Sequence, residues 1–297
     1  MRMDKVTEAV NPAARGLHNK SIAEVLDLLV GEEAQVAAAM REALPSLERA
    51  VELYVRAYRG GGRIVYVGAG TSGRLATVDA AECPPTFGTD PERIRAFIAG
   101  GEAALTRSIE GAEDDRPAGR KLIHQEKIGP QDLLIGLSAS GEAPFVLGAV
   151  EAATGAGAPT VGITCNRLTT LAALVDVAIE VILGPEVVSG STRLKAGTAE
   201  KIVLNLLSTT AMVQLGKVYD GYMVDFQVSN QKLLRRAQRV LRELTEANEE
   251  TITAALAASD NHVKTAALML LKNLDVEKAR ALLQQCEGKL HLALNIK

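Results

Sequence analysis

The spacing of apolar residues changes along the chain, and each change predicts a different kind of secondary structure. Residues 1–20 show no regular period and are expected to form an irregular arm. Ser21 then opens a helix, because Glu24 follows three positions later and the two residues can form a capping box. A second helical stretch covers about 33–57, and Pro45 should kink or divide it.

Short β-rich segments alternate with helical segments from residue 63 onward. The expected strands are residues 63–67, 94–98, 132–137, 160–164 and 177–183. The expected helices are residues 102–111, 117–126, 143–153, 168–174 and 194–216, together with one that starts at the first glycine-rich loop and ends at Glu82. This alternation indicates an α/β fold with a mostly parallel sheet and helices on both of its faces.

The last part of the chain has a helical pattern throughout. One helix is expected from about residue 230 to 258, and shorter amphipathic helices lie within 263–271, 276–285 and 289–294. We therefore expect three parts. They are an N-terminal arm with helices (1–50), a sheet-bearing domain (51–230), and a C-terminal helical region with a small three-helix module (231–297).

Composition and charge narrow the possible functions. Hydrophobic residues make up 47% of the 297 residues and aromatic residues only 3%, so the core must consist of small aliphatic side chains, as in helix-covered parallel sheets. A net charge of −3 argues against a nucleic-acid partner. The sequence shows no apolar run of the roughly 18 residues that span a membrane, and no secretory signal, so we expect a cytoplasmic protein. The three cysteines and four histidines are scattered and predict no metal site.

Three loops carry the residue types that bind a phosphate. Gly70-Thr71-Ser72-Gly73 and Ser138-Ala139-Ser140-Gly141 each follow an expected strand and precede a helix. Free backbone N–H groups and the positive end of the helix dipole favour an anion there. A third segment, which contains Ser191 and Lys195, also precedes a helix and brings hydroxyls and cations together.

Two other interpretations of these loops remain open. Glycine and serine are also common in turns and at helix starts, without any ligand. Gly68, Gly70 and Gly73 match the spacing of a dinucleotide-binding fingerprint, but the next expected strand does not end in the acidic residue that a ribose hydroxyl would need.

Two acidic segments are candidates for acid–base chemistry. Glu82 should end its helix because Pro84 and Pro85 follow, and a carboxylate at a helix C-terminus is electrostatically disfavoured, which suits a general acid. Glu113 lies in a second acidic cluster. A solvated surface position is the alternative for both residues.

Several longer motifs resemble those of a known protein family. The matching stretches are GAGTSGRL at 68–75, DAAECPPTFG at 79–88, IAGGE at 98–102, EGAED at 110–114 and VSGSTRLKAGTAEK at 188–201. With these, the chain resembles N-acetylmuramic acid 6-phosphate etherases, which belong to the sugar isomerase-domain superfamily. The similarity covers nearly the whole chain.

The resemblance implies both a fold and a reaction. The fold would be a five-stranded parallel sheet between helices, with a small C-terminal helical domain, in a homodimer with sites near the subunit interface. The reaction would be a carbon–oxygen lyase reaction that converts the sugar phosphate and water to N-acetylglucosamine 6-phosphate and D-lactate, in cell-wall amino sugar recycling, without metal or organic cofactor. Glu82 and Glu113 would be catalytic, and Ser72, Ser138 and Ser140 would lie in the sugar-phosphate loops.

One departure and two rival functions accompany the resemblance. Glu142-Ala143 stands where the family pattern has Arg-Thr, which affects the local substrate contacts. An aldose–ketose isomerase would use the same phosphate loops and a base at C2, but no second acid. A binding module, either a sugar-phosphate-sensing regulator or an inhibitor protein, could lack both glutamates. A DNA-binding regulator is disfavoured because residues 1–60 hold 8 Lys/Arg against 9 Asp/Glu.

Overall fold

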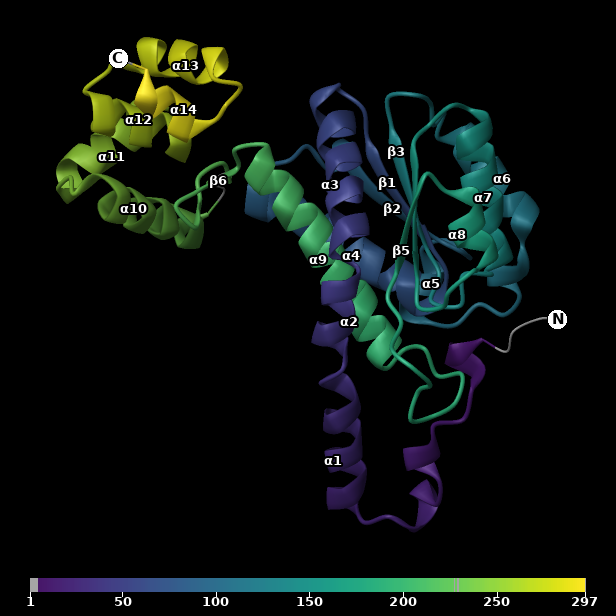
Figure 1. Cartoon of the computed structure of the whole chain (residues 1–297). Helices are drawn as coiled ribbons and strands as arrows, with labels where there is room; N and C mark the ends of the chain where they lie inside the picture. The colour runs from purple at the N-terminus through teal and green to yellow at the C-terminus, as the bar shows by residue number, and fades with distance from the viewer. Residues whose placement is uncertain (1–4, 227, 229, 297) are drawn as a thin grey trace. The chain divides into compact units, whose positions relative to one another are not determined.

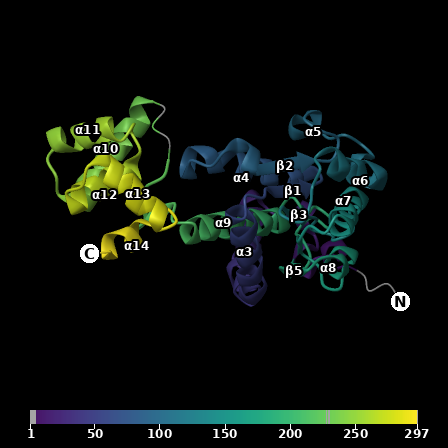
Figure 2. The same cartoon turned by 90° about the horizontal axis from the view of Figure 1, so that it is seen from above.

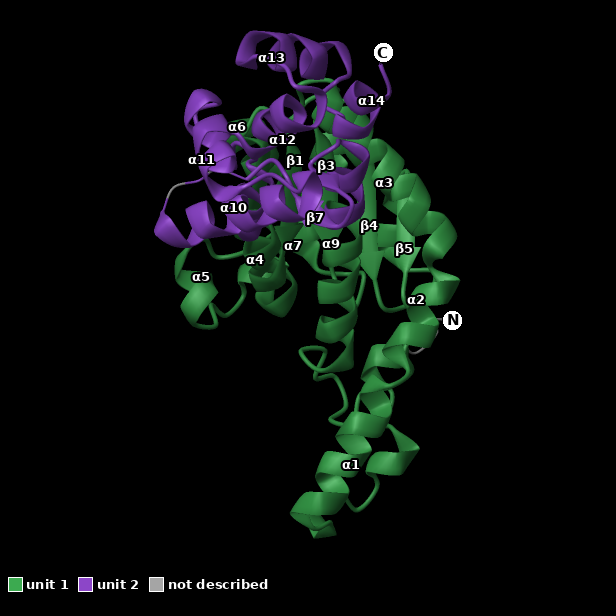
Figure 3. Cartoon of the chain, turned by 90° about the vertical axis from the view of Figure 1, so that its left-hand side faces the viewer, with its two compact units in different colours: residues 1–81, 92–208 green, residues 82–91, 209–297 purple. Residues whose placement is uncertain are grey.

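The computed structural model describes residues 5–296, apart from 227 and 229 (Figure 1). Two compact units are present, one made of residues 1–81 and 92–208 and the other of 82–91 and 209–297 (Figure 3). The boundary between the units falls within two long helices, α4 (Gly70–Phe87) and α9 (Lys195–Gln214). The three-part division expected from the sequence stays a prediction.

A five-stranded parallel sheet forms the centre of the first unit. Its strands are β1 (Ile64–Gly68), β2 (Ile94–Ile98), β3 (Leu133–Leu137), β4 (Thr160–Thr164) and β5 (Val177–Glu180). They lie in the order β2-β1-β3-β4-β5, and every pairing is parallel. The α/β fold and all five expected strands are therefore confirmed.

Helices cover both faces of this sheet (Figures 1 and 2). On one face Val65 and Val67 of β1 pack into a cluster with α6 (Arg116–Gln125), α7 (Pro144–Gly155) and α8 (Thr170–Leu174). Tyr66 points to the other face, where its hydroxyl donates to Asp79 on α4 at 3.1 Å. Ser208 of α9 donates to the same carboxylate at 3.0 Å, and α3 (Leu44–Arg59) contacts β1, β3 and β5. Alternate residues of one strand thus face the two layers of helices.

The N-terminal segment consists of turns and helices. Three 3₁₀ turns, η1 (Val6–Glu8), η2 (Pro12–Ala14) and η3 (Leu17–Asn19), precede α1 (Ile22–Glu33) and α2 (Val36–Glu42). The capping box is confirmed, since the Ser21 N–H donates to Glu24 Oε2 at 2.7 Å and the Glu24 N–H donates to Ser21 Oγ at 3.3 Å. Pro45 lies in the first turn of α3 and divides the helical stretch, as predicted.

Two predicted helices differ from the observed ones, and one further element was not predicted. The helix predicted at 102–111 is reduced to the short α5 (Ala103–Thr106), because the backbone of Arg107 is extended, with φ −145° and ψ 161°. The helix predicted at 230–258 is two helices, α10 (Gln231–Thr245) and α11 (Glu249–Ala258). Glu246 is left-handed, and the Asn248 side chain caps α11. A hairpin of β6 (Val218–Tyr219) and β7 (Tyr222–Met223) was not anticipated.

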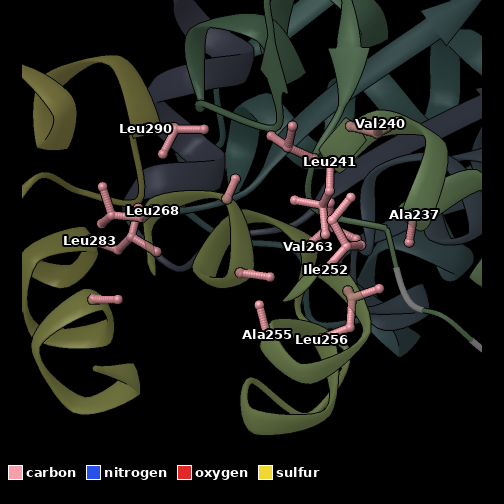
Figure 4. Close-up of a cluster of buried hydrophobic side chains, with 14 of the residues drawn as sticks. Ala237, Val240, Leu241, Ile252, Ala255, Leu256, Val263, Leu268, Leu283 and Leu290 are labelled. Atoms are coloured by element: carbon pink, nitrogen blue, oxygen red, sulfur yellow. The ribbon is translucent and has the colours of Figure 1, made fainter. Parts of the chain in front are cut away.

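The second unit has its own apolar core. Its helices α12 (Val263–Lys272), α13 (Val276–Gln285) and α14 (Leu290–Asn295) match the short C-terminal helices that were predicted, and α10 and α11 contribute to the same core. Figure 4 shows how Leu241, Ile252 and Val263 meet at the centre of the buried cluster. Among the residues that the structure describes, no helix combines the length and apolar character that crossing a membrane requires.

Candidate active site

The first phosphate loop is a tight turn between β1 and α4. A Cβ atom at Gly68 would lie 2.7 Å from the Gly73 nitrogen, and one at Gly73 would lie 2.9 Å from the Gly68 carbonyl oxygen. Gly70 adopts φ +53°. The glycines therefore let the strand and the helix approach closely. The first N–H groups of α4, which have no acceptor within the helix, lie at the carboxyl end of β1.

The start of α9 lies beside the start of α4. A Cβ atom at Gly197 would be 3.4 Å from Cγ2 of Thr71. One turn further along α9, the Glu200 carboxylate accepts a hydrogen bond from the Ser72 hydroxyl at 2.8 Å. Burial raises the pKa of Glu200 to about 7, because its side chain is only 1% exposed. The structure thus brings the first loop together with the segment that begins α9.

The second phosphate loop follows β3, the neighbour of β1 in the sheet. Ser138 Oγ accepts hydrogen bonds from the backbone N–H groups of Gly141 and Ala143 at 3.1 and 3.4 Å. Ser140 Oγ accepts from the Glu142 N–H at 3.2 Å and lies 3.3 Å from Ser138 Oγ. Because β1 and β3 are parallel neighbours, the two loops share the carboxyl edge of the sheet, where ligands of open α/β sheets bind.

The N-terminal arm is attached to loops at this same edge. The Thr7 N–H donates to Asn166 Oδ1 at 3.3 Å, and Asn166 Nδ2 donates back to Thr7 Oγ1 at 3.0 Å. Asn11 Nδ2 donates to the Pro185 carbonyl at 3.3 Å, and Ser189 Oγ donates to the Glu8 carbonyl at 2.9 Å.

Glu142, which departs from the family pattern, has structural partners. Its carboxylate accepts from the N–H and the hydroxyl of Thr170 at 3.1 and 2.7 Å and lies 3.4 Å from Lys5 Nζ. Burial opposes the charge of Glu142, but the bonds from Thr170 and the charge of Lys5 lower its pKa overall. Glu142 therefore holds the first turn of α8 and the arm against the second phosphate loop.

Glu113 and the first phosphate loop line one cleft of about 240 Å³. Glu113 is exposed in the turn η5 (Ala112–Asp114), and Gly70 and Arg74 form the opposite part of the lining. Arg74 holds the segment before η5, since its Nε and Nη2 donate to the carbonyls of Leu105 and Arg107 at 3.1 Å each. A carboxylate, an arginine and the start of a helix thus surround one small space.

Glu82 does not end its helix, contrary to the expectation. The helix α4 continues through Pro84 and Pro85 to Phe87, and Gly88 closes it by donating from its N–H to the Pro84 carbonyl at 2.9 Å. The electrostatic argument that suited Glu82 to the acid role therefore no longer applies. Glu82 is exposed and belongs to the second unit, whereas Glu113 belongs to the first, so their pairing stays a prediction.

Lys195 is buried, although the sequence suggested a cation at an open loop. Its side chain is 2% exposed, and its ammonium group pairs with Glu32 of α1. Its backbone N–H donates to Glu186 Oε2 at 3.3 Å, which caps α9. Ser191 is half-buried in the turn before α9, where its N–H donates to the Val188 carbonyl at 2.9 Å.

Sequence reasoning did not single out two residues that the site contains, Arg74 and Glu200. Glu200 lies on the buried face of α9 with Ala196, Ala199 and Val203. A charged residue on an otherwise apolar helical stripe was the available signal for it. Its partner Ser72 lies 128 positions away, so the contact itself left no local trace.

The fold and these loops define a sugar isomerase (SIS) domain, as comparisons with known proteins confirm. Residues 46–154 match the family described as the glucokinase regulatory protein N-terminal SIS domain, and residues 117–212 match the SIS domain family. A putative phosphosugar isomerase from Bacteroides fragilis has the same fold, with a TM-score of 0.51 and 22% identity over 68% of this chain and 95% of that one. A putative sugar-phosphate isomerase from Listeria monocytogenes also has this fold, with a TM-score of 0.50 and 19% identity. The match covers 66% of this chain and 93% of that one.

Relatives with higher sequence identity show which family of SIS-domain proteins this chain belongs to. The N-acetylmuramic acid 6-phosphate etherase of Gloeobacter violaceus is 48% identical over 99% of this chain and 96% of its own length. Those of Glaesserella parasuis and Shouchella clausii are 45% and 46% identical, each over 96% of this chain and over 94% and 97% of their own lengths. The chain belongs to the N-acetylmuramic acid 6-phosphate etherase family.

Proposed function

We propose that this protein is a lyase that cleaves the D-lactyl ether of N-acetylmuramic acid 6-phosphate, in the recycling of cell-wall amino sugars. The products are N-acetylglucosamine 6-phosphate and D-lactate. Family membership supports the substrate. The observation that carries the chemistry is the cleft that joins Glu113 to the glycine-rich start of α4.

The phosphate of the substrate is assigned to the loops at the carboxyl edge of the sheet. Gly70, Thr71 and Ser72 supply backbone N–H groups and hydroxyls at the start of α4, and Ser138 and Ser140 supply hydroxyls after β3. A third group consists of Ser191, in the turn before α9, and Lys195, at its first residue; Gly197 of the same helix lies close to Thr71. Lys195 would have to exchange Glu32 for the substrate in order to bind it directly.

The reaction requires a base close to C2 of the sugar. An ether is inert at neutral pH because its leaving alkoxide is too basic, but opening of the sugar ring gives a C1 aldehyde that acidifies the C2 proton. Glu113 is assigned as the base that takes this proton. The electron pair left at C2 forms the C2–C3 double bond while the C3–O bond breaks. The enolate oxygen that develops at C1 requires hydrogen-bond donors other than those that hold the phosphate.

A second group must protonate the departing oxygen, and Glu82 is assigned this role. Protonation of the lactyl oxygen releases D-lactate. Glu82, now ionised, takes a proton from water as the water oxygen adds to C3, and Glu113 returns a proton to C2. Each step is a proton transfer, the elimination at C3 or the addition of water, so atoms and electrons balance without an oxidant or a reductant.

Lactate release from N-acetylmuramic acid 6-phosphate tests this function against its rivals. The lyase should form lactate and N-acetylglucosamine 6-phosphate in equal amounts, with deuterium at C2 when the reaction runs in D₂O. An aldose–ketose isomerase would form no lactate, and a sensor or inhibitor protein would bind the sugar phosphate without turnover. Either of these results would exclude the etherase.

Glutamine variants test the roles of the two glutamates. Glu113→Gln and Glu82→Gln should each lower the rate by on the order of 10²–10⁴. With N-acetylglucosamine 6-phosphate in D₂O, Glu113→Gln should abolish exchange at C2, whereas Glu82→Gln should retain some of it. Glu102→Gln, at an exposed glutamate before α5, is the control and should behave as wild type. The reverse exchange pattern would interchange the two roles.

A homodimer in the cytoplasm is the proposed setting. The helix α1 presents Ile22, Leu26 and Val30 on one side, with 83%, 57% and 70% of each residue exposed. None of the residues of α1, all of which the structure describes, is buried, so this apolar stripe suits a second copy of the chain. All three cysteines are buried thiols in the described part of the chain, which accords with a reducing compartment. Fractionation of cells that produce the protein tests the location.

A further inference from the structure

A buried carboxylate lies directly behind the first phosphate loop. Glu200 Oε1 is 2.8 Å from Ser72 Oγ, and the Glu200 side chain is 1% exposed. Two groups face it from neighbouring elements, the Ser72 hydroxyl of α4 and the Cys165 thiol after β4. Burial and the charge of Glu200 both raise the pKa of this thiol. Among the described residues, Glu200 forms no ion pair. Lys195 and Lys201 of its own helix are bonded to Glu32 and Asn205 instead.

The Ser72–Glu200 contact limits what Ser72 can do for a substrate. A serine hydroxyl has one proton and two lone pairs. When Glu200 is ionised it has no proton to give, so Ser72 must donate its own proton to the carboxylate and can present only lone pairs to the loop. When Glu200 is protonated, its O–H donates to Ser72 Oγ, and the Ser72 proton is released toward the loop.

We propose that Glu200 is a positioning residue that must be protonated before Ser72 can donate a hydrogen bond to the substrate phosphate. This inference rests on the proposed function, because it assumes that the first loop holds the phosphate. It adds a requirement to that site, namely that substrate binding and protonation of Glu200 favour each other.

The surroundings of Glu200 make this requirement relevant near neutral pH. Burial places the pKa of Glu200 at about 7 in the unliganded protein. A phosphate dianion at the start of α4 adds a second negative charge a few ångströms away, which raises this pKa further. The protonated form binds, so affinity is full below about pH 7 and falls as the pH rises through the pKa. Binding of phosphate above this pH is therefore accompanied by the uptake of a proton by Glu200.

The pH dependence of binding, compared between wild type and Glu200→Gln, tests the inference. A glutamine amide is nearly isosteric with the protonated acid and donates to Ser72 Oγ at every pH. Above about pH 7 the wild-type KM for N-acetylmuramic acid 6-phosphate should rise by up to about tenfold per pH unit. Glu200→Gln should keep a nearly constant KM from pH 7 to 9. Asp79→Asn, a matched change at another buried carboxylate, which bonds Tyr66 and Ser208, should keep the wild-type slope.

Calorimetry with glucose 6-phosphate as an unreactive probe gives an independent readout. In buffers of different ionisation enthalpy at pH 8, wild type should take up more protons on binding than Glu200→Gln does. If Glu200→Gln showed the wild-type dependence of KM on pH and the wild-type proton uptake, the inference would be wrong, but the proposed lyase function would stand. Loss of binding in a folded Glu200→Gln protein would also overturn the inference, because it would show that the ionised carboxylate is needed. Wild type that neither binds the probe nor releases lactate would instead refute the proposed function.

A second variant keeps the test usable if Glu200→Gln does not fold. Ser72→Ala removes the shared hydroxyl but leaves the carboxylate in place. It should raise KM at pH 7 and weaken the dependence of KM on pH relative to wild type. A Ser72→Ala protein with the full wild-type slope would also contradict the inference.

Discussion

Ser138 and Ser140 lie two positions apart in one turn, but their hydroxyl groups have different surroundings. Ser140 Oγ accepts one backbone hydrogen bond and is half-buried, so its proton can reach a ligand. We expect Ser140→Ala to lose about 1.5–3 kcal/mol of phosphate binding, which corresponds to a rise in KM of roughly 10–150-fold. Steady-state kinetics measures this effect. An unchanged kcat/KM would remove Ser140 from the phosphate site.

Ser138 provides the contrast, because its hydroxyl accepts from the N–H groups of both Gly141 and Ala143. Ser138→Ala leaves the Ala143 N–H without its acceptor, whereas the Gly141 N–H keeps its bond to the Ser138 carbonyl at 2.8 Å, so the variant should lower the free energy of unfolding by about 1–3 kcal/mol. Urea denaturation of Ser138→Ala and Ser140→Ala tests whether Ser138 supports the turn more than Ser140 does. A lower free energy of unfolding for Ser140→Ala than for Ser138→Ala would contradict this.

Single residues also show where sequence reasoning stops. The hydroxyls and glycines of the two loops could be picked out because they stand at strand-to-helix junctions. The ion pair of Lys195 with Glu32 and the bond from Ser72 to Glu200 join residues 163 and 128 positions apart. No local pattern contains such partners, so Lys195 was expected at an open loop and Glu200 was not considered.

At the scale of elements, glycines decide how closely α4 approaches the sheet. A Cβ atom at Gly73 would lie 2.6 Å from Ile98 Cγ1 and 2.9 Å from the Gly68 carbonyl oxygen. Gly73→Ala must therefore push α4 away from β1 and β2, at a cost of about 1–3 kcal/mol in the free energy of unfolding, and it should also weaken substrate binding. Thermal denaturation and KM are the measurements.

Gly31 in α1 is the matched control, because a Cβ atom there would meet nothing within 4 Å. Gly31→Ala should raise stability by up to about 1 kcal/mol, since alanine favours a helix over glycine. If Gly73→Ala and Gly31→Ala changed thermal stability and KM to a similar extent, the turn would not require a glycine at position 73 for close packing.

Elements were predictable where one physical effect dominates. All five strands were found because each is a short apolar run between glycine-rich or polar turns. The continuation of α4 through Pro84 and Pro85 was not predicted, because proline normally ends a helix. The end of this helix is held by its surroundings, since a Cβ atom at Gly88 would lie 2.0 Å from the Asp225 carbonyl oxygen. The break at Glu246 was missed because that residue has no Gly or Pro beside it.

At the scale of the whole molecule, a partly buried charge cluster supports the second unit. Asp225 lies 2.6 Å from Lys217 Nζ, 3.0 Å from Lys264 Nζ and 3.1 Å from His262 Nε2. Burial opposes its charge, but the bond from His262 and the charges of the two lysines lower its pKa overall. Lys264 is 3% exposed. Asp225→Asn would leave this ammonium group without its counter-charge, which should destabilise the unit by about 3–5 kcal/mol.

The same cluster predicts how the second unit responds to acid. The pKa of Asp225 is lower in the folded than in the unfolded protein, so its stabilisation is full above about pH 4 and is lost as the pH falls further. Hydrogen exchange within α12 at pH 7 and at lower pH measures this loss. Asp260→Asn, at a surface ion pair with Arg280, should have little effect. Equal protection of α12 in Asp225→Asn and wild type would contradict the prediction.

The apolar stripe of α1 makes a prediction about assembly. Leu26→Glu places a charge in the middle of the stripe, so it should shift the protein from dimer toward monomer in light scattering at micromolar concentration. Asp27→Asn, one position away, is the control and should remain dimeric. A wild-type protein that is monomeric and fully active at this concentration would refute the homodimer.

The arm that reaches the carboxyl edge also bears on the order in which the protein forms during synthesis. The arm is synthesised before its partners Asn166, Pro185 and Ser189, which stand 159, 174 and 181 positions from the residues that they bond. Closing such long loops costs entropy that is offset only once β4 and β5 are folded. Pulse-labelled hydrogen exchange during refolding should therefore protect the Thr7 N–H after the strands. A nascent chain that ends before Asn166 would therefore leave the arm without any of these three partners.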